Sequence, residues 1–393
     1  MKIISVVGAR PNFMKIAPFI RAIEKYNNNP ELADTEPVTE RIRHLLVHTG
    51  QHYDDRMSKA FFEELNIPQA DINLGIGSGT HAEQVGQTMI EFEKVLQKEK
   101  PDWVIVVGDV NATLACSVTA KKEHVQCCHI EAGLRSGDMT MPEEINRLVT
   151  DRLSDLLLTP DEISGENLRK EGVQEEKIRF VGNIMIDTLE TNRPRAEKLE
   201  LHDIFERNAI NTTFTGFQQN KNLRVATITL HRPSNVDHKE VLVPLVRFLL
   251  DEVCRDMPLV WPVHPRTKKM LELFGLWNEA MNNKNLILLE PVGYLDMLKL
   301  NMQSAIMLTD SGGLQEECTV LGTPCLTMRW NTERPVTLRE HGGASVLVGN
   351  NIDRIRLEYQ NTIRKPRTPV RPEKWDGHTA ERCIEEILKA TQR

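Results

Sequence analysis

The stretch "KIISVVGARPNFMK", Lys2–Lys15, changes from one structural pattern to another within a few residues. Its first part is a short run of β-branched residues, which is typical of a buried strand, and Ile3–Val7 is too short to be the apolar core of a signal peptide. The glycine that follows permits a tight turn, and Pro11 suits the first position of a helix. We therefore expect a strand that leads directly into a helix, which is the repeating unit of doubly wound α/β folds.

The same order recurs along the first half of the chain. Further strands are predicted at "HLLVHTG", "WVIVVGD" and "VQCCHIEAG", and helices at Asn12–Tyr26, Asp54–Leu65, Ala112–Lys122 and Pro142–Ser154. Continuous apolar strands separated by helices favour a parallel sheet that is covered on both faces. We expect one doubly wound domain over residues 1–190.

A charged and polar segment after Asp187, "RPRAEKLELHDIFERNAINTTFTGFQQNKN", contains no apolar run suited to a core strand and indicates a domain boundary. The alternation then resumes with "LRVATITLHR", "MPLVWPVHP", "NLILLEPV", "SAIMLTDSGG" and "PCLTMRW". A second α/β domain is expected over residues 191–370. Residues 371–393 include an amphipathic helix, Thr379–Ala390, which we expect to pack back on the first domain. The predicted fold class is thus α/β, with two doubly wound Rossmann-like domains that face a cleft.

The composition limits the classes of function. The chain has 393 residues and a net charge of -7, which argues against a nucleic-acid-binding protein because such proteins present basic surfaces. It has seven cysteines but no CxxC pair, which favours reduced thiols and a cytoplasmic location. No stretch approaches the roughly 18 apolar residues that a membrane span needs, so we expect a soluble protein.

Acidic residues follow the predicted strands of the first domain. Asp109 comes after the apolar run of "WVIVVGD", and Glu131 follows the next strand. A carboxylate at a strand end faces the crevice where ligands of such folds bind, and burial there raises its pKa toward the range of a general base. Glu143 in "PEEINR" is a third candidate, although acids are common in a first helical turn and Arg147 is a possible i+4 partner.

Basic and polar residues mark a potential anion site. Arg10 and Lys15 lie at the start of the first helix, where backbone N–H groups and the helix dipole already favour negative charge, although both could be ordinary solvated side chains. In the second domain, Ser311, Gly312 and Gly313 follow "AIMLTD" and open a helix that should end at Gly322. This stretch could bind phosphate or could be a plain serine-capped helix.

Histidine–arginine pairs follow two neighbouring strands of the second domain. They are His231 with Arg232 and His264 with Arg266, and together they indicate a polar cleft that tolerates an anion. Two other patterns are dismissed. "GIGSG" lacks the third glycine of a dinucleotide-binding loop, and Thr80 more plausibly caps the next helix. His48 and His52 are spaced as in a zinc site, but the glycine between them argues against a shared helix face, so no metal site is expected.

Taken together, the motifs resemble those of one family. "GARPNFMK", "TGQHYD", "GDVNAT", "HIEAGLRSGD", "PEEINR", "TLHRPSN", "PVHPR", "LTDSGGLQEE" and "TERPV" occur in the order found in the non-hydrolysing UDP-N-acetylglucosamine 2-epimerases, from about residue 2 to residue 349. The resemblance implies a glycosyltransferase-B architecture, usually dimeric. It also implies reversible conversion of UDP-N-acetylglucosamine to UDP-N-acetylmannosamine, by elimination of UDP to 2-acetamidoglucal and re-addition, with neither nicotinamide nor a catalytic metal.

The resemblance also assigns roles to individual residues. It implies acid–base roles for Asp109, Glu131 and Glu143, and places His231 beside the diphosphate. It implies nucleotide and phosphate contacts for a further set of residues: Arg10, Lys15, Ser311, Gly312 and Gly313. Glu317 matches the acid placed for the ribose hydroxyls, and His264 and Arg334 match other positions of the cleft.

The chain departs from the family pattern at two positions. Asn12 and Ser234 stand where many members have glutamate, and the sequence alone does not explain either change. The stretch "GIGSGTHAEQ" lacks the arginine that some bacterial members use to bind an activating substrate molecule, so that regulation is not expected. Several alternatives remain open: an epimerase of UDP-2,3-diacetamido sugars, a hydrolysing 2-epimerase that releases N-acetylmannosamine, a glycosyltransferase, and a nucleotide-sugar sensor.

Overall fold

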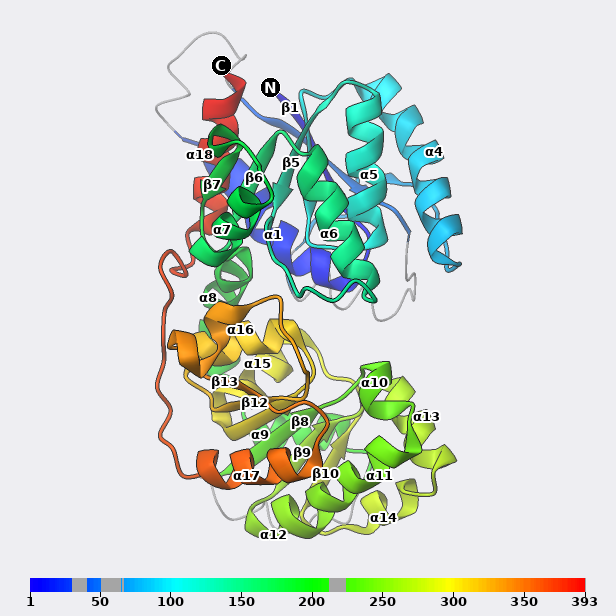
Figure 1. The fold of residues 1–393 in the computed structure, drawn as a ribbon, viewed down its shortest axis with the longest axis vertical. Helices are drawn as coiled ribbons and strands as arrows, with labels where there is room; N and C mark the ends of the chain where they lie inside the picture. The colour runs from blue at the N-terminus through cyan, green and yellow to red at the C-terminus, as the bar shows by residue number, and fades with distance from the viewer. Residues whose placement is uncertain (30–40, 51–64, 66, 212–223, 393) are drawn as a thin grey trace. The chain divides into compact units, whose positions relative to one another are not determined.

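The computed structural model describes residues 1–29, 41–50, 65, 67–211 and 224–392. The chain divides into two compact units, Met1–Thr191 together with Pro372–Arg393, and Asn192–Arg371 (Figure 1). Within the described ranges, no helix is long and apolar enough to cross a membrane. The predicted helix Asp54–Leu65 and His52 fall outside the described residues, except for Leu65 itself.

Unit 1 is built on a seven-stranded parallel sheet with the strand order β3-β2-β1-β4-β5-β6-β7. Its strands are β1 Lys2–Val7, β2 Arg43–His48, β3 Ile72–Asn73, β4 Trp103–Val107, β5 Gln126–Ile130, β6 Leu156–Thr159 and β7 Ile178–Phe180. Its helices are α1 Arg10–Asn27, α4 His81–Glu99, α5 Asn111–Lys122, α6 Pro142–Leu153, α7 Glu162–Lys170, the first part of α8 Ile184–Glu197, and α18 Thr379–Thr391.

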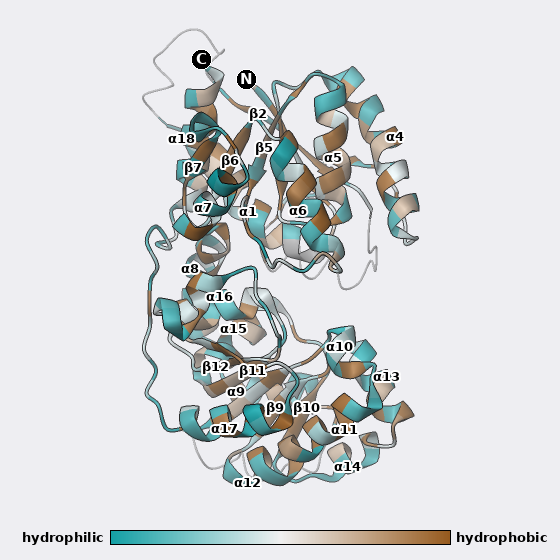
Figure 2. Ribbon diagram, viewed as in Figure 1, coloured by the Kyte–Doolittle hydropathy of each residue, from teal (hydrophilic) through white to brown (hydrophobic). Residues whose placement is uncertain are grey.

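The sheet of unit 1 is buried because helices cover it. Every residue of β4 is buried, as expected for a central strand whose two faces both meet helices. Hydrophobic residues accordingly lie along the strands and the inward helix faces (Figure 2). The C-terminal helix α18 packs beside α1, where Lys25 pairs with Glu381 at 2.5 Å, and its Cys383, Ile384 and Ile387 are buried.

Unit 2 is built on a six-stranded parallel sheet with the order β10-β9-β8-β11-β12-β13. Its strands are β8 Val225–Thr229, β9 Leu259–Pro262, β10 Leu286–Leu289, β11 Ser304–Thr309, β12 Cys325–Thr327 and β13 Ser345–Leu347. Its helices are α9 Leu201–Asn208, α10 Pro233–Val236, α11 Lys239–Phe248, α12 Cys254–Asp256, α13 Pro265–Leu273, α14 Trp277–Asn282, α15 Tyr294–Gln303, α16 Gly312–Leu321 and α17 Ile352–Thr362. The predicted α/β class with two parallel sheets is confirmed.

Each sheet contains one point at which the strand order reverses direction. In unit 1 this point lies between β1 and β4, and in unit 2 between β8 and β11. The segments that leave adjacent strands at such a point run to opposite faces of the sheet, which opens a crevice at the carboxyl ends of the strands. The segments after β1 and β4, and those after β8 and β11, are therefore the places to examine for a functional site.

Local details of the chain follow from its sequence. Thr80 caps α4 as predicted, since it accepts a hydrogen bond from the backbone N–H of Glu83 (3.3 Å) while the Glu83 carboxylate accepts one from the backbone N–H of Thr80 (2.8 Å). Gly322 ends α16 with a φ of 72°, also as predicted. All seven cysteines are free and buried. The polar segment after Asp187 contains no described strand, but it carries the end of α8 and all of α9, whose Ile204 and Phe205 are buried.

Candidate active site

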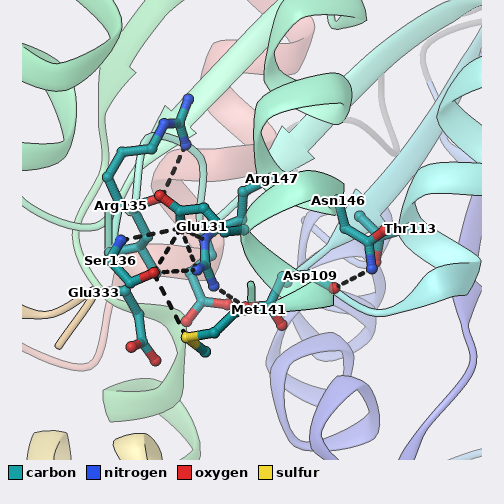
Figure 3. A network of polar contacts seen from close by, with 12 residues as sticks. Asp109, Thr113, Glu131, Arg135, Ser136, Met141, Asn146, Arg147 and Glu333 are labelled. Atoms are coloured by element: carbon teal, nitrogen blue, oxygen red, sulfur yellow. Dashed lines mark hydrogen bonds and ion pairs between the residues drawn. The ribbon is translucent and has the colours of Figure 1, made fainter. Parts of the chain in front are cut away.

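Two carboxylates lie at adjacent strand ends of unit 1, and each has a cationic partner. Asp109 follows β4 and pairs with Arg147 of α6, while Glu131 follows β5 and pairs with Lys15 of α1 (Figure 3 shows the Asp109–Arg147 network). Glu131 and Lys15 are both buried, at 4% and 6% exposure. Each carboxylate therefore lies beside a cationic side chain, at a strand end where a carboxylate can take part in proton transfer.

Gly108 allows these groups to approach one another. Its φ is 69°, and a Cβ at this position would lie 3.0 Å from Nζ of Lys15, 3.4 Å from Nδ2 of Asn12 and 3.4 Å from Oε2 of Glu131. A side chain at residue 108 would thus push apart the ion pair formed by Lys15 and Glu131. The glycine in "VGDVNAT" suits this backbone conformation and also leaves room for the close approach.

Asn12, which the sequence left unexplained, links the ends of β1 and β4. Its Oδ1 accepts hydrogen bonds from the backbone N–H groups of Gly8 (3.3 Å) and Ala9 (3.0 Å), and its Nδ2 donates to the carbonyl oxygen of Val107 (2.8 Å). The side chain is 2% exposed. A glutamate could accept the same backbone hydrogen bonds but could not donate to Val107, so asparagine joins the two strand ends in a way that glutamate cannot.

The neighbours Glu143 and Glu144 occupy different environments. Glu143 is exposed on the first turn of α6. Glu144 is buried and accepts hydrogen bonds from the backbone N–H groups of Ser136 (3.0 Å) and Gly137 (2.9 Å) and from Nε of Arg147 (3.1 Å). Burial opposes ionisation of Glu144, but these donors outweigh it and lower its pKa. Arg147 forms ion pairs with Asp109 and Glu144, in addition to any contact with the Glu143 that the sequence suggested.

The backbone around Glu131 is held in an unusual conformation. Glu131 has a φ of 76°, in the left-handed region that non-glycine residues rarely adopt. Two residues later, the N–H of Gly133 donates to Oδ2 of Asp151 (3.0 Å), whose Oδ1 lies 2.6 Å from Nδ1 of His129. Nε2 of His129 contacts the carbonyl oxygen of Gly108 at 2.8 Å. The buried His129–Asp151 pair therefore connects the turn that bears Glu131 to the one that precedes Asp109.

In unit 2, the N-terminus of α16 lies against a buried cluster of charges. A Cβ on Gly312 would lie 2.8 Å from Nη1 of Arg334 and 3.0 Å from Oε1 of Glu333, so only glycine leaves room for this ion pair. Nε of Arg334 also lies 2.7 Å from Oε1 of Glu316. Burial opposes ionisation of Glu333, but Arg334 and Arg329 hold its pKa well below the usual range. Ser311 is the N-cap residue of α16, and a Cβ on Gly313 would meet no atom within 4 Å.

Glu317 is a buried acid on the second turn of α16. Its side chain is 3% exposed, and its polar neighbours are the hydroxyl group of Tyr294 and the amide of Asn301. Burial raises the pKa of Glu317 to about 7, because these polar neighbours compensate only in part for lost hydration. Near neutral pH, this carboxyl group can either donate or accept a hydrogen bond.

Replacing Glu317 with Gln is expected to flatten the pH dependence of the stability of unit 2. Because the pKa is 4.5 in the unfolded chain and about 7 in the folded one, the folded state binds more protons between those values. Wild-type stability should therefore fall as the pH rises from about 4.5 to 7, by at most about 3 kcal/mol, and stay low above that range. Urea denaturation at pH 5 and pH 8 measures this, with the exposed Glu290→Gln as control. Equal pH dependence in wild type and Glu317→Gln would contradict it.

The two histidines of unit 2 are neighbours. The ring centroids of His231 and His264 are 5.9 Å apart. Nδ1 of His231 lies 2.7 Å from the buried carboxylate of Asp310. His264 caps α13, since its Nδ1 accepts a hydrogen bond from the backbone N–H of Arg266 (3.2 Å). Burial and the neighbouring His231 lower the pKa of His264. Arg266 is paired with Asp237.

The predicted residues are distributed over both units. In unit 1, Lys15 pairs with Glu131, Asp109 lies at the adjacent strand end, and Glu143 is exposed on α6. In unit 2, His231 and His264 are neighbours, and Arg334 lies beside Gly312 of α16, the helix that also carries Ser311, Gly313 and Glu317. Arg10 is the first residue of α1, and its side chain lies outside the described part of the structure.

Sequence reasoning overlooked several buried partners of these residues: His129, Glu144, Asp151 and Asp310. Asp310 follows β11 directly, as Glu131 follows β5, so the rule that selected Glu131 would also have selected it. His129, Glu144 and Asp151 have no comparable signal, because their roles depend on contacts between residues distant in sequence.

Comparisons with known proteins agree on one family. The UDP-N-acetylglucosamine 2-epimerase family profile matches residues 37–388. UDP-N-acetylglucosamine 2-epimerase from Methanocaldococcus jannaschii is 42% identical over 386 residues, covering 98% of each chain. UDP-2,3-diacetamido-2,3-dideoxy-D-glucuronate 2-epimerase from Pseudomonas aeruginosa is 40% identical over 369 residues, covering 93% of each.

A solved structure supports the same assignment. The crystal structure of the Methanocaldococcus jannaschii enzyme in complex with UDP-GlcNAc and UDP is similar with a TM-score of 0.84 and 41% identity, and the match covers 99% of this chain and 100% of that one. The similarity therefore spans both units, including every strand end at which the candidate residues lie. This chain is a member of the UDP-N-acetylglucosamine 2-epimerase family.

Proposed function

We propose that this protein interconverts UDP-N-acetylglucosamine and UDP-N-acetylmannosamine. The observation that carries the proposal is the pair of charge-partnered carboxylates, Asp109 and Glu131, at neighbouring strand ends of unit 1. Its 42% identity to an epimerase of this substrate, over almost the whole chain, supports it further. Inversion at C2 needs groups that remove a proton from that carbon and return one to it, and carboxylates at such positions can do both.

The proposed reaction begins with elimination. The bond between C1 and the β-phosphate oxygen breaks, its electron pair leaves with UDP, a carboxylate takes the proton from C2, and a C1=C2 double bond forms in 2-acetamidoglucal. Addition of UDP to C1 and of a proton to the opposite face of C2 completes the inversion. We assign the proton transfers to Asp109, Glu131 and Glu143, without dividing them between the two directions of the reaction.

Unit 2 is proposed to bind the nucleotide and stabilise the departing UDP. The N-terminus of α16, with Ser311, Gly312 and Gly313, would bind a phosphate through backbone N–H groups. Glu317 would accept or donate a hydrogen bond to the ribose hydroxyls, and His231 would stabilise the charge that develops on the diphosphate. Arg10, Lys15, His264 and Arg334 are proposed as further substrate contacts. No cofactor or metal enters this scheme.

The test is epimerisation of UDP-N-acetylglucosamine in deuterated water, followed by NMR. We expect UDP-N-acetylmannosamine with deuterium at C2, because the proton removed from C2 exchanges with solvent before another is returned. Free N-acetylmannosamine as the accumulating product would indicate a hydrolysing enzyme, and transfer without deuterium at C2 would indicate a glycosyltransferase. No turnover of this substrate, with turnover of a UDP-2,3-diacetamido uronic acid, would shift the assignment to the specificity of the Pseudomonas aeruginosa relative.

We further propose that the protein acts in the cytoplasm as a homodimer. Exposed apolar side chains support an interface between copies, because Ile90 on α4 is 58% exposed and Ile145 on α6 is 44% exposed. Both helices pack against α5, so they belong to one side of unit 1. Sedimentation velocity distinguishes a monomer from a dimer directly.

A further inference from the structure

Asp310 is the residue between β11 and Ser311, and its side chain is completely buried. Its Oδ2 accepts hydrogen bonds from the backbone N–H groups of His231 (3.0 Å) and Arg232 (2.9 Å) and from Nδ2 of Asn235 (3.2 Å). Its Oδ1 lies 2.7 Å from Nδ1 of His231. One carboxylate therefore holds both the backbone and the ring of His231, across the point in unit 2 where the strand order reverses.

The contact with Asp310 determines which nitrogen of the His231 ring can act on a ligand. Burial disfavours the charged form of Asp310, but the His231 ring and the backbone donors outweigh this effect and lower its pKa. An ionised carboxylate can only accept hydrogen bonds, so Nδ1 of His231 must carry a proton. The side chain of His231 is 42% exposed, so Nε2 is the nitrogen that can meet a ligand.

We infer that Asp310 is a positioning residue for His231. It fixes the orientation of the ring and keeps the proton on Nδ1, so that Nε2 faces the ligand and, when it carries a proton, can donate it to a departing phosphate oxygen. The inference rests on the role proposed above for His231.

Other charged groups surround this pair. The ring centroids of His264 and His231 are 5.9 Å apart, and burial together with the neighbouring His231 lowers the pKa of His264. Arg232 donates from Nε to the backbone oxygen of Asp310 (3.0 Å), and Arg266 is neutralised by Asp237. Among the contacts described around His231, the one with Asp310 is therefore the one that holds the ring through Nδ1.

A double-mutant cycle separates positioning from a structural role. Asp310→Asn keeps the size of the side chain, but one of its two terminal atoms becomes a donor, so it can no longer both hold the backbone and face Nδ1–H. We expect kcat to fall at least about 10-fold, with a smaller change in KM. In a His231→Asn background, the same change should cause no further loss of kcat, because the ring on which Asp310 acts is absent.

Asn235→Ala is the matched control, because it removes another donor from the same carboxylate and leaves the ring contact intact. It should change kcat much less than Asp310→Asn does. Equal losses from Asp310→Asn in the wild-type and His231→Asn backgrounds would overturn the inference, since Asp310 would then only join the two strand ends.

Nitrogen NMR of histidine-labelled protein provides a test that does not depend on activity. The His231 signals, assigned by their absence from His231→Asn, should show a protonated Nδ1 in the wild type. A neutral ring with its proton on Nε2 would overturn the inference even if Asp310→Asn failed to fold. Wild-type protein that shows a protonated Nδ1 but does not epimerise the substrate would instead overturn the proposed function and leave the positioning contact standing.

Discussion

Asp109→Asn and Glu131→Gln are each expected to lower kcat by about 10²–10⁴-fold, because each removes a group assigned to proton transfer while keeping its size. Asp109 and Glu131 lie at neighbouring strand ends, each beside a cationic side chain. The amides cannot accept a proton from C2, so the loss should appear in both directions of the reaction. Steady-state kinetics from each nucleotide sugar, with UDP binding and thermal unfolding measured on the same samples, test this. Wild-type activity in either variant would refute its assignment.

The adjacent glutamates of α6 provide an internal control for these measurements. Glu143 is exposed and is proposed to act on the substrate, whereas Glu144 is buried and holds Ser136, Gly137 and Arg147. Glu143→Gln should therefore lose activity at unchanged stability. Glu144→Gln should instead lower the free energy of unfolding, because the substitution alters a buried acceptor of several hydrogen bonds. The reverse pattern would mean that the roles of the two residues are exchanged.

Gly133→Ala is expected to destabilise unit 1 by about 3 kcal/mol or more. Gly133 has a φ of 83°, and a Cβ there would lie 2.3 Å from the carbonyl oxygen of Ser164 in α7. That oxygen belongs to the backbone of a packed helix, so the turn itself would have to move. Since this turn follows Glu131 directly, activity should fall together with stability. Chemical denaturation and activity of the same preparation provide the measurements.

Gly172→Ala separates the clash from the backbone strain. Gly172 has nearly the same φ, 79°, but a Cβ there would meet no atom within 4 Å. This variant should therefore cost only the roughly 1–2 kcal/mol of a left-handed residue and leave turnover unchanged. If both variants lost the same free energy of unfolding, the clash between a Cβ at residue 133 and Ser164 would not contribute to the loss of stability.

The sequence pattern predicted the strands well because they are buried on both faces and therefore read as continuous apolar runs. The β4 run "WVIVV" is one example, and the residues after it, Gly108 and Asp109, lie at the strand-order reversal that parallel sheets use for ligands. The cap at Thr80 and the end of α16 at Gly322 were also predictable, since both depend on a residue and its immediate neighbours.

Ion-pair partners were not predictable from spacing. Helical spacing pointed from Arg147 to Glu143, but it gave no sign of the ion pairs with Glu144 and with Asp109, a residue 38 positions away in the chain. Asn12 likewise made sense only when β4 was placed beside β1, because its amide donates to Val107. Such contacts depend on which strand lies next to which, and local periodicity does not contain that information.

The packing of α18 on unit 1 has a consequence for biosynthesis. Asp187 accepts hydrogen bonds from the backbone N–H groups of Thr379 (3.1 Å) and Ala380 (2.7 Å), and Nε1 of Trp375 donates to the carbonyl oxygen of Pro160 (2.9 Å). These residues emerge from the ribosome only after all of residues 192–371. Helix α18 can therefore pack on the rest of unit 1 only when synthesis is nearly finished. Unit 2 is continuous in the chain and can complete its core first.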